Sequence, residues 1–341
     1  MKSTLRDIAE RAKVSPATVS NALNGRGGVS KSVQESILAI AQEMGYQQTH
    51  KPNRSGQHVR LIVYKSHGMV VTDTPFFSEL IESIQLECHR FGLELLISHV
   101  NARTDSDFTA QIRSFCSEEC NGLILLGTEM DAQELSRFCD CRSPMIVLDN
   151  TFRTEDVHSV TMNNIQAGRL AAHELYRAGH RQIGHITSSI GFNNVYERMQ
   201  GLRDGLAEHG LTLSDDQIWP VLPTMNGAYE DMKRLLREGR ALPEAFFAAN
   251  DLMAIGCMRA MTEAGYRIPE DVSIIGMDDT AICQACTPQL TTIHVYRHEL
   301  GILATRTLLA LHEEIIGGSI KTEIGVSLVS RASVMTKTPN S

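Results

Sequence analysis

Apolar residues recur at helical spacing at the start of the chain. Between Leu5 and Ala12 they follow the i, i+3, i+4, i+7 pattern, which predicts a short helix with one apolar stripe. Ser15 can cap a second helix by accepting a hydrogen bond from a free backbone N–H, and Pro16 suits its first position. Two short helices joined by a tight turn predict a helix-turn-helix.

The outward face of the second predicted helix carries short polar or very small side chains, which suit a helix that enters the DNA major groove. Asn21 is the first candidate for base readout, because an amide pairs bidentately with adenine. A helical hairpin inside a larger core is the alternative interpretation, and the combination of a cap with a polar face favours DNA binding. The residues of this face are Ala17, Ser20, Asn21 and Asn24.

A third apolar stripe runs from Val33 to Met44 and predicts another helix, which Gly45 ends. The predicted head therefore spans residues 1–46. Residues 47–60 are polar, contain Pro and Gly and lack an apolar stripe, so they predict a linker.

Short apolar runs alternate with helical patterns from residue 61 onwards, which predicts an α/β body with helices on both faces of parallel sheets. The order suggests two lobes. The predicted strands are Leu61–Tyr64, Leu93–Ser98, Gly122–Leu126, Met145–Leu148, Ser159–Met162, Gln182–Thr187, Ala245–Ala248, Val272–Gly276, Thr292–Ile293 and Val326–Val329.

Length and composition narrow the class of protein. A chain of 341 residues with 42% hydrophobic residues can form a small head and about two further domains. No apolar run has the length of a membrane span or follows a charged start, so we expect a cytoplasmic protein. In that compartment the eight cysteines are expected to be reduced thiols.

Charge separates the head from the body. Residues 1–58 hold eight Lys or Arg and four Asp or Glu, a balance of +4, whereas the whole chain carries −8 and the remainder therefore −12. A basic head on an acidic body is expected of a protein in which only the head approaches phosphates.

Metal and enzymatic interpretations find less support. The pairs Cys139/Cys141 and Cys283/Cys286 have no obvious partner pair for a zinc site. The chain lacks a phosphate-binding G-x-x-x-x-G-K-[ST] loop, a G-x-S-x-G elbow and a dinucleotide glycine fingerprint. We expect no catalytic residue, metal or cofactor.

Polar residues follow several predicted strands of the body. Asp149, Asn250 and Asp278 stand just after apolar runs, where ligands bind in open parallel sheets, and Arg198 opens a helical pattern. Together they could recognise the hydroxyls of a small ligand. Taken singly, each Asp or Asn could equally cap a helix or form a turn.

Several segments carry a family resemblance. TLRDIAERAKVSPATVSNALNG, followed by VS and MGY, resembles the DNA-binding headpiece of the lactose-repressor/galactose-repressor (LacI/GalR) family of bacterial transcription regulators. ERMQGL, AANDLMAIGCMRAMTEAGYRIPEDVSIIGMDDT and PQLTTI resemble its effector domain. The resemblance implies a two-lobed, periplasmic-binding-protein-like body over 61–337. Lobe 1 would span about 61–160 and 292–322, and lobe 2 about 161–291 and 323–337.

The resemblance also implies site residues. Base reading falls on Pro16, Ala17 and Asn21, and the hinge has Ser55 near the place where the family inserts a leucine into DNA. The full predicted DNA-binding set is Thr4, Ser15, Pro16, Ala17, Thr18, Ser20, Asn21, Asn24, Asn53 and Arg54. The predicted effector-binding set is Asp149, Arg198, Asn250 and Asp278, with Phe77, Met162, Leu222 and Arg297 as further pocket positions.

These observations favour a sequence-specific transcriptional repressor that binds a palindromic operator as a dimer. A small effector, expected to be a sugar or sugar derivative, would control operator affinity through movement of the lobes. The alternatives are a regulator that responds to a purine-like or sugar-acid corepressor, and an enzyme with a DNA-binding head.

Overall fold

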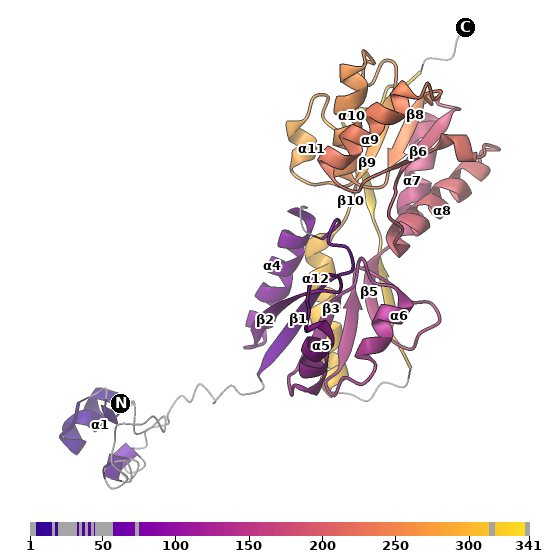
Figure 1. Ribbon diagram of the computed structural model, residues 1–341. Coiled ribbons are helices and arrows are strands. Elements are labelled where there is room, and N and C mark those ends of the chain that lie inside the picture. Colours follow the sequence, from indigo (N-terminus) through magenta and orange to yellow (C-terminus); the bar gives the residue numbers. More distant parts are fainter. Residues whose placement is uncertain are drawn as a thin grey trace. The chain divides into compact units, whose positions relative to one another are not determined.

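The computed structural model describes residues 5–15, 18–19, 33, 36–37, 40–41, 44, 57–71, 75–313 and 318–337. The chain forms two compact units, Met1–Ser55 and Gly56–Ser341, and each is described by itself. Figure 1 shows the elements of both units in the order of the chain.

The head has a small apolar core. Its first helix, α1, spans Leu5–Ala12, and Ile8 on this helix is completely buried. Val19 and Ile37 are equally buried and belong to the same cluster, so residues from all three predicted helical stretches share one core. Val33 is the exception to the predicted third stripe, because its side chain is 37% exposed.

The cap predicted for the second helix is present. The backbone N–H of Thr18 donates a hydrogen bond of 3.1 Å to Oγ of Ser15. The remaining predicted DNA-binding residues lie outside the described residues, as does most of the predicted linker. They are Thr4, Pro16, Ala17, Ser20, Asn21, Asn24, Asn53 and Arg54.

Lobe 1 of the body is built on a six-stranded parallel sheet in the order β11-β5-β4-β3-β1-β2. Helices α4 (Pro75–Arg90) and α12 (Arg297–Glu313) cover one face, and α5 (Phe108–Ser117) with the short α6 (Ala132–Leu135) covers the other. The strands are β1 (His58–Lys65), β2 (Glu94–Asn101), β3 (Gly122–Leu126), β4 (Met145–Leu148), β5 (His158–Met162) and β11 (Lys321–Ile324).

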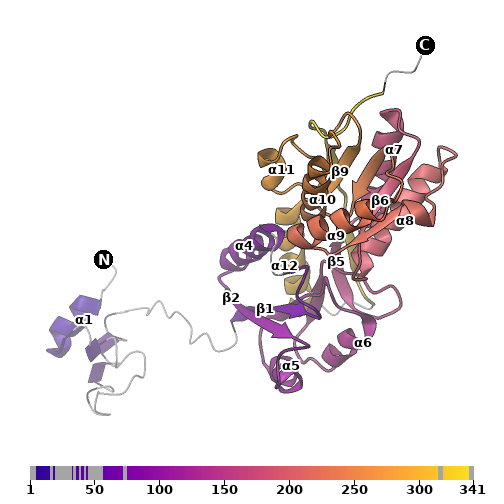
Figure 2. The same ribbon diagram turned by 45° about the horizontal axis from the view of Figure 1, so that its top comes forward.

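Lobe 2 repeats this three-layer plan with the order β12-β10-β9-β8-β6-β7, in which only β12 runs antiparallel to its neighbour. Figure 2 shows α7 and α8 on one face of the sheet and α9 and α10 on the other. The strands are β6 (Ile183–Ser188), β7 (Ile218–Val221), β8 (Ala245–Ala248), β9 (Ser273–Asp278), β10 (Thr291–His294) and β12 (Ser327–Val329). The helices are α7 (Asn164–Arg177), α8 (Asn193–Ala207), α9 (Met225–Arg237), α10 (Asp251–Glu263) and α11 (Ile282–Ala285).

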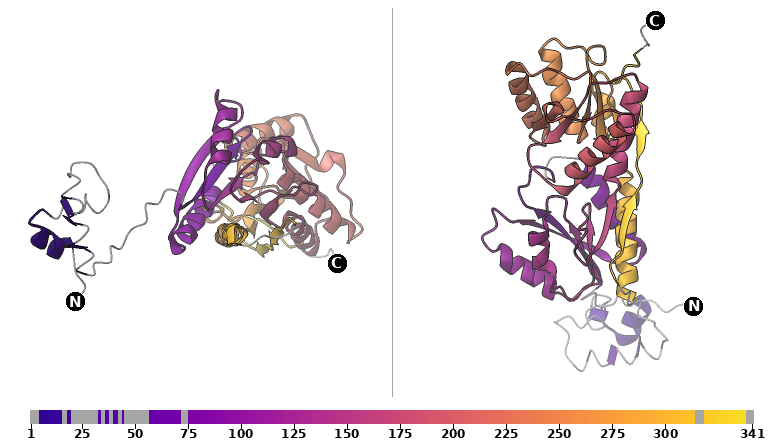
Figure 3. Two further views of the ribbon diagram at one scale, coloured as in Figure 1. Left: turned by 90° about the horizontal axis from the view of Figure 1, so that it is seen from below. Right: turned by 90° about the vertical axis from the view of Figure 1, so that its right-hand side faces the viewer.

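The chain passes between the lobes three times, at 162–164, 294–297 and 324–327. Each lobe boundary predicted from the sequence lies a few residues before the corresponding crossing in the structure and is corrected accordingly. The largest consequence concerns β10, which pairs with β9 and β12, so Thr292 belongs to lobe 2 and not to lobe 1. Figure 3 shows the last crossings along one side of both lobes, beside α12.

Two strands were not predicted. β7 reads Ile-Trp-Pro-Val, and β11 reads Lys-Thr-Glu-Ile with alternating exposure. Both are edge strands, so they do not need the continuous apolar run by which a strand buried on both faces is recognised.

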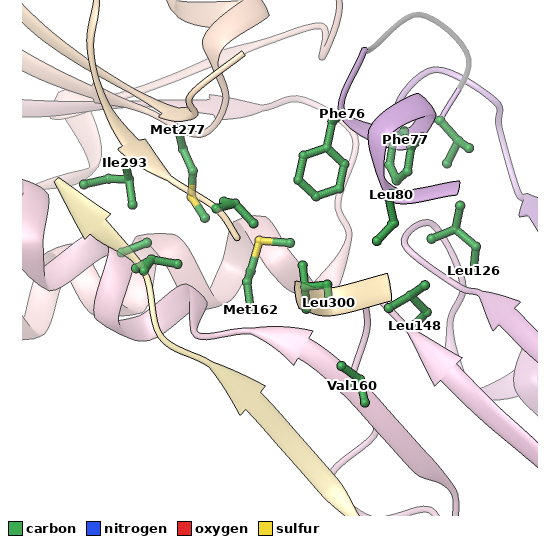
Figure 4. Packing of buried hydrophobic residues seen from close by; sticks show 14 of the residues in the cluster. Phe76, Phe77, Leu80, Leu126, Leu148, Val160, Met162, Met277, Ile293 and Leu300 are labelled. Atoms are coloured by element: carbon green, nitrogen blue, oxygen red, sulfur yellow. The ribbon is translucent and has the colours of Figure 1, made fainter. Parts of the chain in front are cut away.

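One apolar cluster extends through both lobes. It joins Leu148 and Met162 from lobe 1 with Met277 and Ile293 from lobe 2. In Figure 4 Met277 and Ile293 lie to the left of the Phe76 ring of α4, and Met162 and Leu148 lie below it. The two lobes therefore share a core at the crossings.

The expectation of eight reduced cysteines is corrected at one pair. Cys116 and Cys141 form a disulfide, because α5 and the segment before β4 bring their Cα atoms within 3.9 Å. The other six cysteines are free. Within the described part of the chain, no helix is both long and apolar enough to cross a membrane.

Candidate ligand-binding site between the lobes

A polar cavity lies where the carboxyl ends of β4, β5 and β9 meet the start of α8. Its volume is about 30 Å³, enough for about two waters. A larger ligand therefore requires the walls to move. The lining residues are Val70, Phe76, Phe77, Thr128, Asp149, Met162, Phe192, Asn194, Arg198, Asn250 and Asp278.

Asp149 follows β4 in a left-handed backbone conformation, with φ of 62°, and is 1% exposed. One carboxylate oxygen accepts a hydrogen bond of 2.6 Å from the Thr128 hydroxyl, and the other accepts one of 3.1 Å from the Asn194 amide. Burial raises the pKa of Asp149 to about 6, although Thr128, Arg198 and Asn194 act in the opposite direction. Asp149 is thus held in place by protein donors.

Arg198 projects from α8 and is 5% exposed. Its Nε donates to Oδ1 of Asn164 at 2.9 Å, and its Nη1 donates to the carbonyl of Ala249 at 2.5 Å. Nη2 lies 3.3 Å from the sulfur of Met162. The guanidinium is therefore fixed in one orientation beside two carboxylates, those of Asp149 and Asp278.

Asp278 differs from Asp149 in its partners. It ends β9 with φ of 117°, and no described residue donates a hydrogen bond to its carboxylate. Burial raises the pKa of Asp278 to about 8, assisted by the negative charges of Asp251 and Asp149 and opposed by Arg198 and Arg297. This carboxyl group faces the cavity with its hydrogen-bonding capacity unused.

Asn250 serves two purposes. Its Oδ1 accepts a hydrogen bond of 2.8 Å from the backbone N–H of Met253, so it is the N-cap of α10. Asn250 also lines the cavity. Because the cap uses only the oxygen, the amide NH₂ remains as a donor for a ligand.

Aromatic rings form the apolar part of the lining. Phe76 and Phe77 pack edge to face, with ring centroids 5.1 Å apart, and Figure 4 shows both on α4. Phe192, just before α8, contributes a third ring from lobe 2. The cavity thus combines aromatic surface with convergent polar groups, as small-molecule sites do.

A loop of lobe 1 is held against the cavity by a buried carboxylate. Glu129 accepts hydrogen bonds from four backbone N–H groups, at 2.7 to 3.3 Å. The four donors are His67, Gly68, Val70 and Val71, and Val70 itself lines the cavity.

The structure brings together six of the eight predicted effector positions: Phe77, Asp149, Met162, Arg198, Asn250 and Asp278. Leu222 does not line the cavity, because it follows β7 and lies against the start of α9, 2.5 Å from the place a Gly227 side chain would occupy. Arg297 is also absent from the lining and instead holds Asp278 through its backbone carbonyl.

Phe76, beside Phe77 in the PFF segment, also lines the cavity. The sequence did not indicate four other lining residues: Val70, Thr128, Phe192 and Asn194. Thr128 stands just after β3, so the strand-end argument applied to Asp149 would have found it. Asn194 lies in the first turn of α8, and nothing in its local sequence indicates that it reaches Asp149 in the other lobe.

Several polar contacts join the lobes around the cavity. Asn194 donates to Asp149, and Nη2 of Arg153 lies 3.1 Å from Oε1 of Glu197. The described lining contains no Ser, Cys, His or Lys that could act as a nucleophile or base. The arrangement is suited to binding a polar ligand and to sensing it through the interlobe contacts.

The chain matches two known families. Residues 4–49 match "Bacterial regulatory proteins, lacI family", and residues 172–334 match "Periplasmic binding protein-like domain". The HTH-type transcriptional repressor PurR of Haemophilus influenzae is 31% identical over 316 residues, which cover 90% of each chain. The HTH-type transcriptional regulator AscG of Escherichia coli is 32% identical over 298 residues, covering 86% of this chain and 87% of its own.

A solved structure agrees over nearly the full length. The lac repressor dimer bound to operator and the anti-inducer ONPF has a TM-score of 0.74 and 26% identity, covering 98% of this chain and all of that one.

Proposed function

This chain belongs to the lacI family of bacterial regulatory proteins, and on that premise we propose that a neutral, hydroxyl-rich ligand, a sugar or sugar derivative, controls its binding to operator DNA. It is a DNA-binding transcriptional repressor and not an enzyme.

The free carboxyl group of Asp278 carries the ligand assignment. Asp278 is only partly buried and its carboxyl group accepts no hydrogen bond from a described residue, so it is open to a ligand hydroxyl. Arg198 is already balanced by Asp149, so the lining offers no surplus positive charge to attract an anionic ligand such as a sugar acid. The donors and acceptors that remain, with the Asn250 amide, match several hydroxyls of a neutral sugar.

A purine-like ligand is the second candidate, because three phenylalanine rings line the cavity and could stack on a flat base. The relative PurR, which is 31% identical to this chain, is a transcriptional repressor. This candidate makes no use of the free Asp278 as a hydroxyl acceptor, and a ligand screen separates the two.

For DNA recognition we propose the second helix of the head, which the Ser15 cap begins. Asn21 would read adenine, and Ala17 with Pro16 would contact a thymine methyl group. Ser15, Thr18, Ser20 and Asn24, with Thr4, Asn53 and Arg54, would contact phosphates and the groove.

Two heads on one operator require a dimer, and lobe 1 offers an apolar surface for it. Leu86 is 50% exposed, Phe91 54% and Ile97 44%. Leu86 is on α4, Phe91 follows it, and Ile97 lies on β2, the edge strand of the sheet. Exposed apolar side chains beside an unpaired strand edge are typical of an interface between protein chains. We name Leu86, Phe91, Leu96 and Ile97 the edge patch.

The effector signal would pass through the interlobe contacts. The cavity holds only about two waters, so a sugar enters by moving the lobes or the Phe76–Phe77 wall. Movement of lobe 2 against lobe 1 would change the contacts of Asn194 and Arg297, and would alter the spacing of the two heads in a dimer. A coupling of about 1–3 kcal/mol changes operator affinity by roughly 5- to 150-fold.

The experiment begins with thermal unfolding of the full-length protein against neutral sugars and glycosides, sugar acids and purines. A ligand that binds only the folded state raises the melting temperature by mass action. Each hit is then added to a binding assay on operators selected from random duplex DNA. We expect a neutral sugar to shift the melting temperature and to change operator affinity, and the selected duplexes to be palindromic.

The Asp278→Asn variant localises the site, with Asp271→Asn as the matched control on the surface of the same lobe. A sugar response lost in the first variant and kept in the second supports the proposal. A response to purines or sugar acids alone would contradict the assignment of a neutral sugar and leave the family unaffected.

A further inference from the structure

A second cavity, distinct from the interlobe site, lies on lobe 1 between α5 and the segment 137–142. Its volume is about 500 Å³, within the range of about 300–1,000 Å³ typical of small-molecule sites. It shares no lining residue with the interlobe cavity. Figure 1 places α5 at the part of lobe 1 that faces away from lobe 2.

The lining is basic although the body is acidic. Three arginines, Arg113, Arg137 and Arg142, stand against one carboxylate, Asp140, which leaves a local balance of +2. Residues 59–341 as a whole carry −12, from the −8 of the chain and the +4 of residues 1–58. A concentration of positive charge in such a body favours an anionic ligand.

The guanidinium groups are available to a ligand. The side chains of Arg113 and Arg142 form no hydrogen bond, ion pair or ring contact with any residue in the described part of the chain, and Arg137 only stacks over Phe108, at 4.9 Å. By contrast, Arg60 on the neighbouring β1 is paired with Glu118 at 2.5 Å. An arginine cluster without carboxylate partners retains its forked donors for another oxyanion.

The walls of this cavity are tied together. The disulfide between Cys116 and Cys141 joins α5 to the opposite wall, and the backbone N–H of Arg142 donates to the carbonyl of Cys116 at 2.9 Å. Ile112 and Cys116 form a buried apolar floor, at 3% and 7% exposure. The cavity thus has linked backbone walls, exposed arginine side chains at its rim and an apolar base.

We propose that this cavity is a second effector site, and that it binds a small organic phosphate monoester. The terminal phosphate presents three oxygens, one for each guanidinium, whereas a carboxylate presents two. The apolar floor would contact the organic part of the ligand. The repressor would then receive a second small-molecule signal, independent of the ligand between the lobes.

The test uses the full-length protein and glycerol 3-phosphate as the probe, with thermal unfolding and calorimetric titration at constant ionic strength. Inorganic phosphate and malonate, a dicarboxylate, are titrated in parallel. We expect a saturable rise in melting temperature with glycerol 3-phosphate, and a weaker one with inorganic phosphate, which lacks the organic part. Malonate should bind more weakly than either.

The variant Arg113→Gln/Arg142→Gln should weaken glycerol 3-phosphate binding at least tenfold, because two of three charge-assisted donors are lost. Arg103→Gln/Arg177→Gln removes the same charge from exposed positions outside the cavity and should bind as the unaltered protein does. An equal loss in both variants, or full binding in the first, would overturn the proposal. Malonate binding more tightly than the phosphates would overturn the phosphate assignment.

Discussion

The guanidinium of Arg297, at the start of α12 in lobe 1, donates a hydrogen bond to the backbone carbonyl of Asp278, at the end of β9 in lobe 2. Its Nε also donates to Glu79 of α4, at 2.8 Å. One buried side chain therefore connects the residue with the free carboxyl group to the helix that carries Phe76 and Phe77. Arg297 acts as a positioning residue of the cavity without lining it.

We predict that Arg297→Gln weakens effector binding several-fold and lowers the free energy of unfolding by about 1–3 kcal/mol, because a charge-assisted contact between the lobes is lost. Arg306→Gln is the control, since Arg306 lies on the same helix but pairs with Glu87 inside lobe 1. It should affect stability alone. Calorimetric titration and urea unfolding measure the two effects, and equal loss of affinity in both variants would refute a positioning role.

A pH prediction follows from the raised pKa of Asp278. The folded protein binds this proton more tightly than the unfolded chain, so the stabilisation is complete below about pH 4 and is lost as pH rises through about 8. Asp278→Asn cannot lose a proton and removes this slope. The variant should therefore be more stable than the unaltered protein at pH 8 while binding the effector less tightly.

The stability contributed by Asp271 should depend on pH in the opposite direction, because its pKa is lowered. It is paired with Arg267 at 2.6 Å, and hydrogen bonds from Arg267 lower the pKa of Asp271 to about 2. Its stabilisation is present above about pH 4 and is lost as pH falls through about 2. Asp271→Asn should consequently lose stability only at neutral pH. Urea unfolding from pH 3 to pH 8 distinguishes the two variants, and parallel curves would contradict both assignments.

The DNA-binding and effector-binding functions should be separable by mutation. Asn21→Ala is expected to weaken specific operator binding at least tenfold and to leave effector affinity intact. Arg198→Ala should do the reverse. Because Arg198 is buried and holds three partners, Arg198→Lys is measured beside it with circular dichroism as the check on folding. Damage to both functions by either folded variant would argue against two separate sites.

The edge patch should be required for dimerisation. Phe91→Glu places a charge at the most exposed residue of the patch and should produce monomers in sedimentation experiments. Operator affinity should fall on the order of 100-fold, because the second head is lost. Tyr196→Glu, at a ring that is 57% exposed on lobe 2, is the matched control. A Phe91→Glu dimer of unchanged stability would place the interface elsewhere.

The sequence predicted the buried strands well, because runs such as Gly122–Leu126 are apolar on both faces. Strands β7 and β11 escaped prediction because neither has a continuous apolar run: β7 contains a proline, and β11 reads Lys-Thr-Glu-Ile, with one apolar residue. Interlobe crossings came from a family resemblance and were misplaced by a few residues, since periodicity reports burial and not which sheet a strand joins.

The site was predictable to a similar extent. Asp149 and Asp278 follow strands whose carboxyl ends meet, so their convergence follows from the topology. Leu222 and Arg297 were assigned to the pocket by matching positions with the family, and neither lines the cavity. Whether Arg297 reaches a ligand or a carbonyl depends on Glu79, which lies 218 positions away in the chain, and no local pattern contains that information.

The three crossings also have a consequence during protein synthesis. β11 and β12 complete the two sheets, and both lie close to the carboxyl end of the chain. A nascent polypeptide that emerges from the ribosome up to residue 320 therefore exposes an unpaired edge, that of β5, in one lobe and another, that of β10, in the second. Products that end before residue 320 would therefore expose an unpaired strand edge in each lobe.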